Sequence, residues 1–178
     1  EIWRGRVSDF SIQWTESDIK VFKQDDDNPI FSTRAMAQQD FEQQDSRFRE
    51  NDCIYQRNFR ILSIVGNIAS FQDIEEITCE NTHNPIKNKN FFALDLSNGR
   101  EVKLTDFFSE FNIFKALALD SLIQKNLAHH AKMPKTLKNL EEILNRRGIL
   151  LNDCVYSFEN ALKQFAFHHV KNNKVSVR

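Results

Sequence analysis

The stretch from Cys53 to Cys79, "CIYQRNFRILSIVGNIASFQDIEEITC", constrains the fold of this chain more than any other segment. Two runs rich in β-branched and aromatic residues flank Gly66-Asn67, a pair typical of tight hairpin turns. The sequence therefore predicts a long antiparallel hairpin with a cysteine at each of its open ends.

The register of this hairpin depends on the length of its tip. If the tip is the three-residue Val65-Gly66-Asn67, the facing pairs are Ile61 with Phe71, Arg57 with Glu75, Tyr55 with Ile77, and Cys53 with Cys79. A two-residue tip would shift the pairing by one and separate Arg57 from Glu75. We therefore predict the three-residue tip and a disulfide between Cys53 and Cys79.

Two alternatives to this disulfide stay open. The segment "NDCIY" at Asn51–Tyr55 is nearly repeated as "NDCVY" at Asn152–Tyr156, so a Cys53–Cys154 pair would lay two strand starts side by side. Three reduced thiols would instead indicate a cytosolic protein, because the cytosol keeps cysteines reduced. Beyond this echo the two halves of the chain share no register, which argues against a duplication.

The remaining segments predict short strands and helices. Strands are expected at "DFSIQW", "DIKVF", "FFALDL", "EVKL", "CVYSF", "QFAFHHV" and "KVSVR". Ser32 is predicted to cap a helix that ends near Glu50. Apolar residues at helical spacing predict a helix from Asn112 to about His129 and another from Thr136 to Arg147. Between the strands we expect polar loops, including Glu80–Asn90.

The order of these elements predicts the fold class. Strands and helices follow in blocks without βαβ alternation, which favours an α+β fold, an antiparallel sheet with helices packed on one face. Among these helices, Leu117, Leu122 and Ile123 are expected to be buried. We expect residues 1–50 to form a small N-terminal β–helix segment, packed on a main domain of residues 51–178.

Composition and charge exclude several classes of protein. The chain has 16 Phe among 178 residues, which indicates a packed core rather than disorder. Its 24 basic and 25 acidic residues leave no basic field for nucleic acid. No apolar run approaches the ~20 residues that span a bilayer. The chain opens without Met, so we expect an excised fragment, and a signal peptide or membrane anchor outside it stays open.

Catalytic and metal-binding motifs are not visible in the sequence. Four of the five histidines form adjacent pairs, and the neighbours of such a pair point in different directions on a helix or strand. Each cysteine has an acidic neighbour or apolar surroundings, which disfavour a reactive thiolate. The phosphate-loop and nucleophile-elbow patterns are missing from the sequence. We therefore predict no catalytic residue, no metal site and no cofactor.

One part of the chain carries a family resemblance. The segment "NTHNPIKNKNFFALDLSNGREVKLTDFF", followed by an amphipathic helix, resembles the extracytoplasmic domain of RsiV-type anti-sigma factors. The same domain precedes the catalytic part of PdaC-type peptidoglycan deacetylases and occurs in bacterial lipoproteins of unknown function. The matching positions are His83, Asn84, Pro85, Asp95, Gly99, Leu104, Asp106 and Phe107. The resemblance covers about residues 53–178, although Cys79-Glu80-Asn81-Thr82 stands where the family has glycines.

The resemblance implies a non-catalytic binding or sensing module that faces the bacterial cell envelope, in the periplasm or anchored to a membrane. Its ligand would be an envelope protein or a cell-wall glycan. The alternatives are an accessory domain of a cell-wall hydrolase or deacetylase, and a structural lipoprotein domain without a small ligand. The polar segment Glu80–Asn90 and the hairpin Ser97–Arg100 are the expected contact surface, because loops held by strands often carry recognition. The candidate binding residues are His83, Asn84, Lys87, Asn98 and Arg100.

Overall fold

The fold was analysed in a computed structural model. The structure describes residues 3–7, 9–43, 53–80, 85–128, 134–146, 157–172 and 174–177. The chain divides into two compact units. Glu1–Val102 with Phe165–Arg178 form one, called the sheet unit below, and Lys103–Gln164 form the other, called the helical unit. The fold class is α+β with antiparallel sheets, as predicted.

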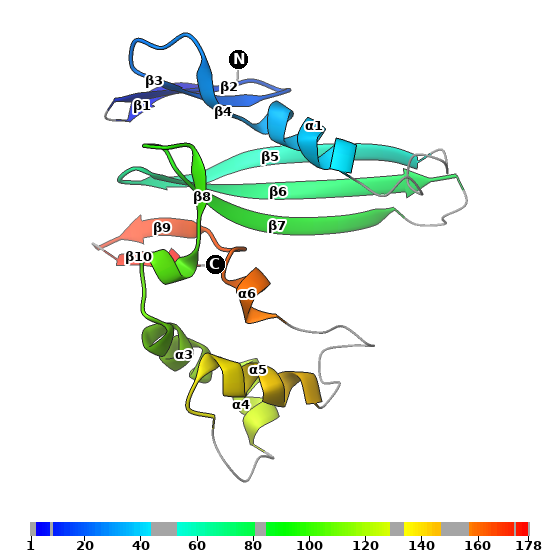
Figure 1. The fold of residues 1–178 in the computed structure, drawn as a ribbon, viewed down its shortest axis with the longest axis vertical. Helices are drawn as coiled ribbons and strands as arrows, with labels where there is room; N and C mark the ends of the chain where they lie inside the picture. The colour runs from blue at the N-terminus through cyan, green and yellow to red at the C-terminus, as the bar shows by residue number, and fades with distance from the viewer. Residues whose placement is uncertain are drawn as a thin grey trace. The chain divides into compact units, whose positions relative to one another are not determined.

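The sheet unit begins with a four-stranded antiparallel sheet, called the N-terminal sheet (Figure 1). Its strands are β1 (Trp3–Val7), β2 (Phe10–Trp14), β3 (Ile19–Lys23) and β4 (Pro29–Ser32), in that order. The predictions for β2 and β3 are confirmed, whereas β1 and β4 were not predicted. Phe10, Ile12, Ile19 and Val21 alternate with exposed or half-buried residues, so one face of this sheet is buried.

Helix α1 (Thr33–Gln43) follows β4 directly. The hydroxyl of Ser32 accepts a hydrogen bond from the backbone N–H of Ala35 at 3.1 Å, which confirms Ser32 as the cap. The predicted end of this helix near Glu50 lies outside the described residues.

The second sheet, called the long sheet, contains β5 (Cys53–Val65), β6 (Ile68–Cys79), β7 (Ile86–Asp95) and β8 (Arg100–Val102) in sequence order. All four predicted cross-strand pairs are confirmed. The predicted three-residue tip is wrong, because Val65 pairs with Ile68 and leaves only Gly66-Asn67 in the turn. Gly66 has a φ of 58°, which a two-residue hairpin turn requires. A bulge between Ile61 and Ser63 adds one residue and restores the predicted register beyond it.

The structure corrects the predicted loop Glu80–Asn90. Residues 86–90 belong to β7, and they continue its pairing with β6 from Asp73↔Asn90 to Ile77↔Ile86. The polar Asn and Lys residues of this segment have a low propensity for strands, but backbone pairing with β6 makes the segment a strand all the same. His83 and Asn84, in the remainder of this segment, lie outside the described residues.

The N-terminal sheet and the long sheet share one hydrophobic core. Buried residues of β2 and β3 cluster with residues of β6, β7 and the turn after it: Phe10, Ile12, Ile19, Val21, Ala69, Phe71, Phe92, Leu94 and Leu96. The N-terminal segment therefore has no separate core, and the division of the chain falls at residues 103 and 164 rather than at residue 50.

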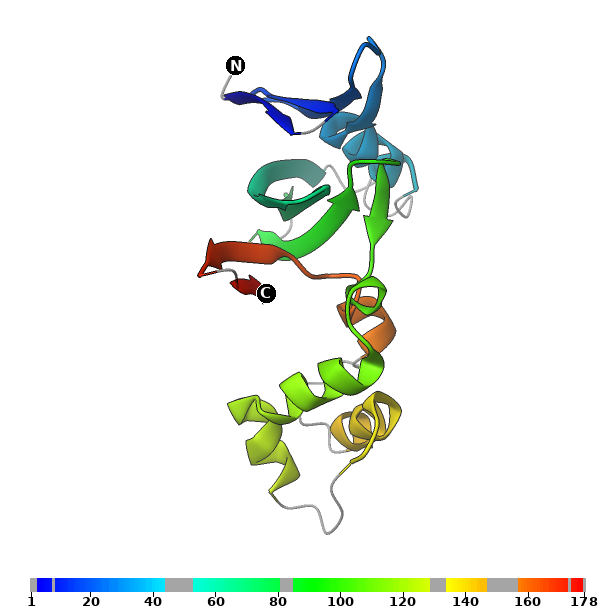
Figure 2. The ribbon, with the colours of Figure 1, turned by 90° about the vertical axis from the view of Figure 1, so that its left-hand side faces the viewer.

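The C-terminal strands β9 (Phe167–Lys171) and β10 (Lys174–Val177) form a two-stranded sheet and confirm two of the predicted strands (Figure 2). Ser63 of β5 donates a hydrogen bond to the carbonyl of Phe167, and the N–H of Phe167 donates to Ser70 of β6 at 2.9 Å. Ser70 and Phe71 point to opposite faces of the long sheet. Strand β9 therefore contacts the face turned away from the shared core.

The helical unit contains a 3₁₀ turn η1 (Leu104–Asp106) and helices α3 (Glu110–Ala118), α4 (Ser121–Leu127), α5 (Leu137–Arg146) and α6 (Phe158–Ala161). The single helix predicted over residues 112–129 is two helices. A new helix starts because the Asp120 carboxylate accepts a hydrogen bond from the N–H of Ile123 at 3.1 Å. The second predicted helix corresponds to α5, and the Thr136 hydroxyl just before it accepts a hydrogen bond from the N–H of Asn139 at 3.2 Å. The predicted strand "CVYSF" is wrong at Phe158, which begins α6, and its residues 154–156 lie outside the described residues.

The helical unit has a hydrophobic core of its own. Its buried members are Ile113, Leu127, Leu137, Leu140, Leu144 and Phe158. Leu117 and Ile123, predicted to be buried, are half-buried and pack against this cluster. The side chain of Leu122, the third residue of this prediction, lies outside the described part of the structure. Within the helical unit, α3 packs against α4 and α5, and α5 contacts α6. Within the sheet unit, α1 contacts β3 and β4.

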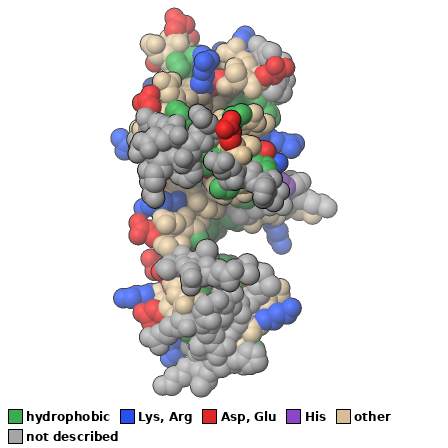
Figure 3. Space-filling model, turned by 90° about the vertical axis from the view of Figure 1, so that its right-hand side faces the viewer, with side chains coloured by type: hydrophobic (Ala, Val, Ile, Leu, Met, Phe, Trp, Pro, Cys, Tyr) green, Lys and Arg blue, Asp and Glu red, His purple; other side chains and the backbone are tan. Residues whose placement is uncertain are grey.

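No helix in the described part of the chain is long and apolar enough to cross a membrane. On the surface drawn in Figure 3, Lys and Arg side chains are interspersed with Asp and Glu side chains.

Candidate binding site

A buried arginine organises the charged residues of the sheet unit. Arg57 of β5 has a side chain only 9% exposed, and it lies opposite Glu75 of β6, as predicted. Its guanidinium donates to both carboxylate oxygens of Asp73, at 2.6 and 3.0 Å, and also to Asp40 of α1. The Nε atom lies 3.5 Å from the Glu75 carboxylate, which accepts a hydrogen bond from the Tyr55 hydroxyl. These five residues are called the Arg57 cluster.

Burial and hydrogen bonding shift the pKa values of Arg57, Asp73 and Tyr55. Burial lowers the pKa of Arg57, but hydrogen bonds from its guanidinium to Asp73 and Asp40 outweigh burial and hold that pKa above its ordinary value. Burial raises the pKa of Asp73, and the hydrogen bonds from Arg57 oppose this rise. Burial is also the main reason that the pKa of Tyr55 is raised to about 12. At neutral pH Arg57 is therefore charged and Tyr55 is neutral.

A cleft of about 330 Å³ lies beside this cluster. Its lining combines the turn between β2 and β3 with the start of α1 and the middle of β5: Trp14, Thr15, Glu16, Ser17, Asp18, Ile19, Thr33, Arg57, Asn58 and Phe59. This volume falls at the lower end of the roughly 300–1,000 Å³ typical of small-ligand sites.

Hydrogen bonds hold the wall of the cleft in place. The Asp18 carboxylate, nearly buried, accepts hydrogen bonds from the hydroxyls of Ser32 and Thr33 and from the backbone N–H of Arg34, at 3.0–3.1 Å. Thr33 in turn accepts from the N–H of Ile19 at 2.9 Å. Asp18 therefore fastens the turn to the N-terminus of α1, where a negative charge is favourable.

The lining offers two kinds of contact to a ligand. Trp14 and Phe59 supply aromatic surface, and the Arg57 guanidinium carbon lies 4.9 Å from the centre of the Phe59 ring. Glu16 and Ser17 are exposed polar residues of the cleft lining. Aromatic surface beside hydroxyl, carboxylate and guanidinium groups suits a polyhydroxylated ring, which has both apolar faces and hydrogen-bonding edges.

The residues predicted from sequence as a binding set are not gathered in one place. Lys87 lies on β7 and forms an ion pair with Glu76 of β6 at 3.1 Å. Asn98 and Arg100 lie in and beside the turn at the other end of β7, roughly 25 Å from Lys87 at the rise per residue of a strand.

The side chain of Asn98 forms hydrogen bonds within its own turn, between β7 and β8. Asn98 donates to the Asp95 carboxylate at 3.1 Å, and its side-chain oxygen accepts from the N–H of Arg100 at 2.9 Å. Gly99 has a φ of 69°, and a Cβ added to it would lie 2.8 Å from the carbonyl oxygen of Ile30 in β4. The turn is thus fitted against the N-terminal sheet.

Replacing Gly99 with alanine is expected to destabilise the sheet unit by about 1–3 kcal/mol, because it adds a steric clash to backbone strain. Gly66→Ala is the matched control. Gly66 also has a positive φ, but a Cβ there would meet nothing within 4 Å. Urea unfolding of both variants should show the larger loss for Gly99→Ala, and equal losses would refute the clash with Ile30.

The predicted disulfide between Cys53 and Cys79 is present and closes the open end of the β5–β6 hairpin. Cys154, the partner in the alternative pairing, lies outside the described residues. No group of three or more His, Cys, Asp or Glu residues within the described ranges is arranged to hold a metal ion.

Reduction of this disulfide is expected to lower the melting temperature by roughly 10 °C. The bond joins residues 26 positions apart, and a loop of that size stabilises the fold by about 3–4 kcal/mol in the chain-entropy model. Thermal unfolding with and without dithiothreitol measures the shift. The Cys53→Ser/Cys79→Ser double variant should melt at the reduced temperature in both conditions. An unchanged melting temperature of the native protein on reduction would contradict the prediction.

The sequence interpretation missed Trp14, Asp18, Asp40 and Asp73 as residues of one region. One signal was available for Arg57, since it stands in phase with Tyr55, Phe59 and Ile61 on β5. A charged residue in the buried phase of a strand needs a partner, and that partner is found across the sheet.

Fold and site together define an α+β protein with a ligand-sized cleft beside a paired, buried arginine. No known family model matches the chain, and no curated protein matches it significantly.

Proposed function

We propose that this chain is a non-catalytic, extracytoplasmic binding module, and that the cleft beside Arg57 binds a glycan of the cell envelope. The observation that carries the proposal is the cleft itself. It joins the aromatic side chains of Trp14 and Phe59 to charged groups that are already held in place by other residues.

Binding rather than bond cleavage fits the carboxylates beside the cleft. A glycosidase needs two carboxyl groups that face the scissile bond from opposite sides. Asp18 accepts hydrogen bonds from Ser32, Thr33 and the N-terminus of α1, and Asp73 forms an ion pair with Arg57. Neither carboxylate can leave its partners without leaving a buried polar group unpaired. Glu16, the other carboxylate of the lining, is exposed and would lack the second catalytic carboxyl group.

The extracytoplasmic location is supported by the disulfide between Cys53 and Cys79, since such bonds persist in oxidising compartments. The resemblance of residues 53–178 to envelope-facing domains of anti-sigma factors and peptidoglycan deacetylases supports the same location.

The proposal is tested by measuring the binding of purified peptidoglycan fragments. The fluorescence of Trp14 in a Trp3→Phe background monitors this binding. The Trp14→Phe variant has less aromatic surface but keeps an apolar side chain, so we expect its affinity, measured by calorimetry, to be about tenfold weaker. Gln13→Ala changes the neighbouring residue on the other face of β2 and is the matched control. If the native protein binds no fragment, or if both variants bind as the native protein does, the cleft is not a glycan site.

A further inference from the structure

Negative charges outnumber positive charges around the cleft beside Arg57. Within the part of the chain that the structure describes, five carboxylates lie in the lining or pair with Arg57, and two cations lie within ion-pair distance of them. The carboxylates belong to Glu16, Asp18, Asp40, Asp73 and Glu75, and the cations are Arg57 and Lys20. The cleft is therefore an electronegative surface.

Arg57 is poorly placed to bind an anionic ligand, because three carboxylates already surround its guanidinium. Nε and Nη2 donate to Asp73, and Nη1 donates to Asp40. The Glu75 carboxylate lies 3.5 Å from Nε. A carboxylate or phosphate brought to Arg57 would meet these negative charges at short range, and like charges repel. The cleft therefore disfavours an acidic ligand.

The two carboxylates of the lining, Glu16 and Asp18, differ in what they offer to a ligand. Asp18 is 9% exposed, and donors at the N-terminus of α1 already occupy its oxygens. Glu16 is exposed, and no Lys or Arg in the described ranges lies within ion-pair distance of it. Glu16 is thus the charged group of the lining that can pair with a ligand, and its partner would be a cation.

The aromatic part of the lining suits the same kind of ligand. Trp14 stands two residues before Glu16 and lines the same cleft. The face of an indole ring attracts a cation, because the ring quadrupole is negative there. The same face can also pack against the apolar face of a sugar ring. An aromatic ring and an exposed carboxylate in one cleft therefore fit a ligand that combines a sugar ring with an ammonium group.

We propose that the glycan bound in this cleft contains an amino sugar with a free amine, rather than an N-acetylated or acidic sugar. This inference rests on the glycan site proposed above. The ammonium group pairs with the Glu16 carboxylate, and the sugar ring packs on Trp14. Acetylation turns the ammonium into a neutral amide and removes this ion pair. An acidic sugar brings a further negative charge to an electronegative cleft.

The probes are three soluble tetramers: β-1,4-linked glucosamine, β-1,4-linked N-acetylglucosamine, and lysine. Calorimetry with the full chain, at about pH 6 where primary amines are charged, should show about tenfold tighter binding of the glucosamine tetramer than of its N-acetylated counterpart. This preference should fall as salt is added, because the ion pair at Glu16 is exposed to solvent. The lysine tetramer has a comparable charge but no sugar rings, so it should bind more weakly than the glucosamine tetramer.

Variants of Glu16 test the role of its carboxylate. Glu16→Gln keeps the size of the side chain and removes its charge, so the preference for the amine should fall to about twofold or less. Glu16→Lys should make the N-acetylated tetramer the tighter ligand. Glu80→Gln is the matched control, because it removes the same charge from an exposed residue just after β6, outside the lining. It should leave the preference unchanged.

Equal affinity of the native chain for the two glycans, or tighter binding of the N-acetylated one, overturns the inference and leaves the glycan site standing. A preference that survives in Glu16→Gln, or that falls as much in Glu80→Gln, also overturns it. Binding of the lysine tetramer as tight as that of the glucosamine tetramer would show a general charge effect, with the same consequence. If neither glycan binds, the glycan site itself fails, and the inference fails with it.

Discussion

Replacing Asp73 with alanine is expected to destabilise the sheet unit by about 3–5 kcal/mol, because it leaves the charge of Arg57 buried with too few partners. The Asp73 side chain is 3% exposed, and it accepts hydrogen bonds from two nitrogens of the Arg57 guanidinium. Urea unfolding at neutral pH, followed by tryptophan fluorescence, measures the loss.

Two comparisons isolate this charge effect. Asp40→Ala removes a partner that is 46% exposed, and it should cost no more than about 1 kcal/mol. The double variant Arg57→Met/Asp73→Leu removes both buried charges and should be more stable than Asp73→Ala alone. A loss below about 1 kcal/mol for Asp73→Ala would show that Arg57 finds water or another partner.

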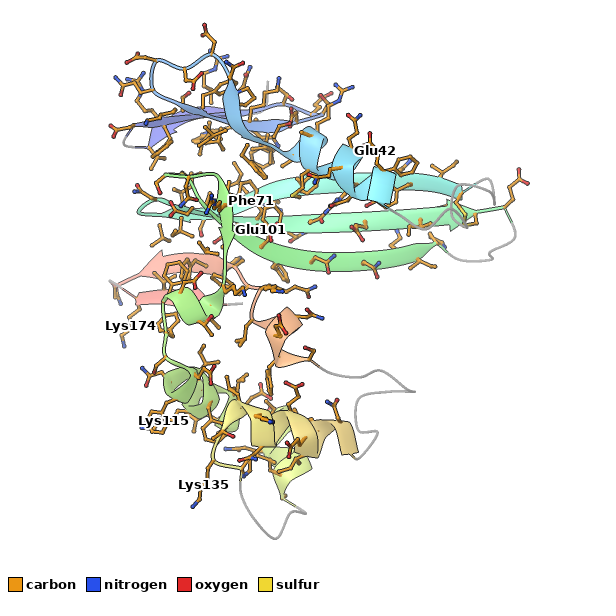
Figure 4. The ribbon with its side chains drawn as sticks, in the orientation of Figure 1. Glu42, Phe71, Glu101, Lys115, Lys135 and Lys174 are labelled. Carbon is orange, nitrogen blue, oxygen red and sulfur yellow. A yellow bond between two sulfur atoms is a disulfide. The ribbon has the colours of Figure 1, made fainter. Side chains whose placement is uncertain are left out.

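Replacing Phe71 with alanine is expected to cost about 3–5 kcal/mol of stability in the sheet unit, through lost burial and the cavity left behind. Phe71 lies on β6 (Figure 4) and is completely buried. Its ring stacks on Phe92 with centres 4.8 Å apart and lies 5.6 Å from the ring of Phe31 in β4. It therefore joins the N-terminal sheet to the long sheet.

Thermal and urea unfolding of Phe71→Ala should also show that the N-terminal sheet and the long sheet melt together, because they share this core. Ile54→Ala is the control, since Ile54 on β5 is 62% exposed and its truncation should change stability by no more than ~0.5 kcal/mol. Separate melting of the two sheets, with little loss for Phe71→Ala, would contradict the shared core.

The sequence alone was sufficient wherever the signal is local. Ser32 caps α1 because its hydroxyl reaches the N–H of Ala35, three residues away. The pairing of Cys53 with Cys79 followed from the register of two neighbouring strands. That register was chosen because it sets Arg57 opposite Glu75 and apolar residues opposite one another. It was reached through a wrong turn length, which the bulge after Ile61 compensates.

Features that depend on distant residues were decided only by the tertiary structure. Residues 86–90 are mostly polar and were predicted to form a loop, but their pairing with β6 makes them part of β7. The cleft joins Trp14, Asp18 and Arg57, which are far apart in sequence and come together only because two sheets bury one core. The physical reason is that propensity and capping act over a few residues, whereas burial and ion pairing act on whatever the fold brings together.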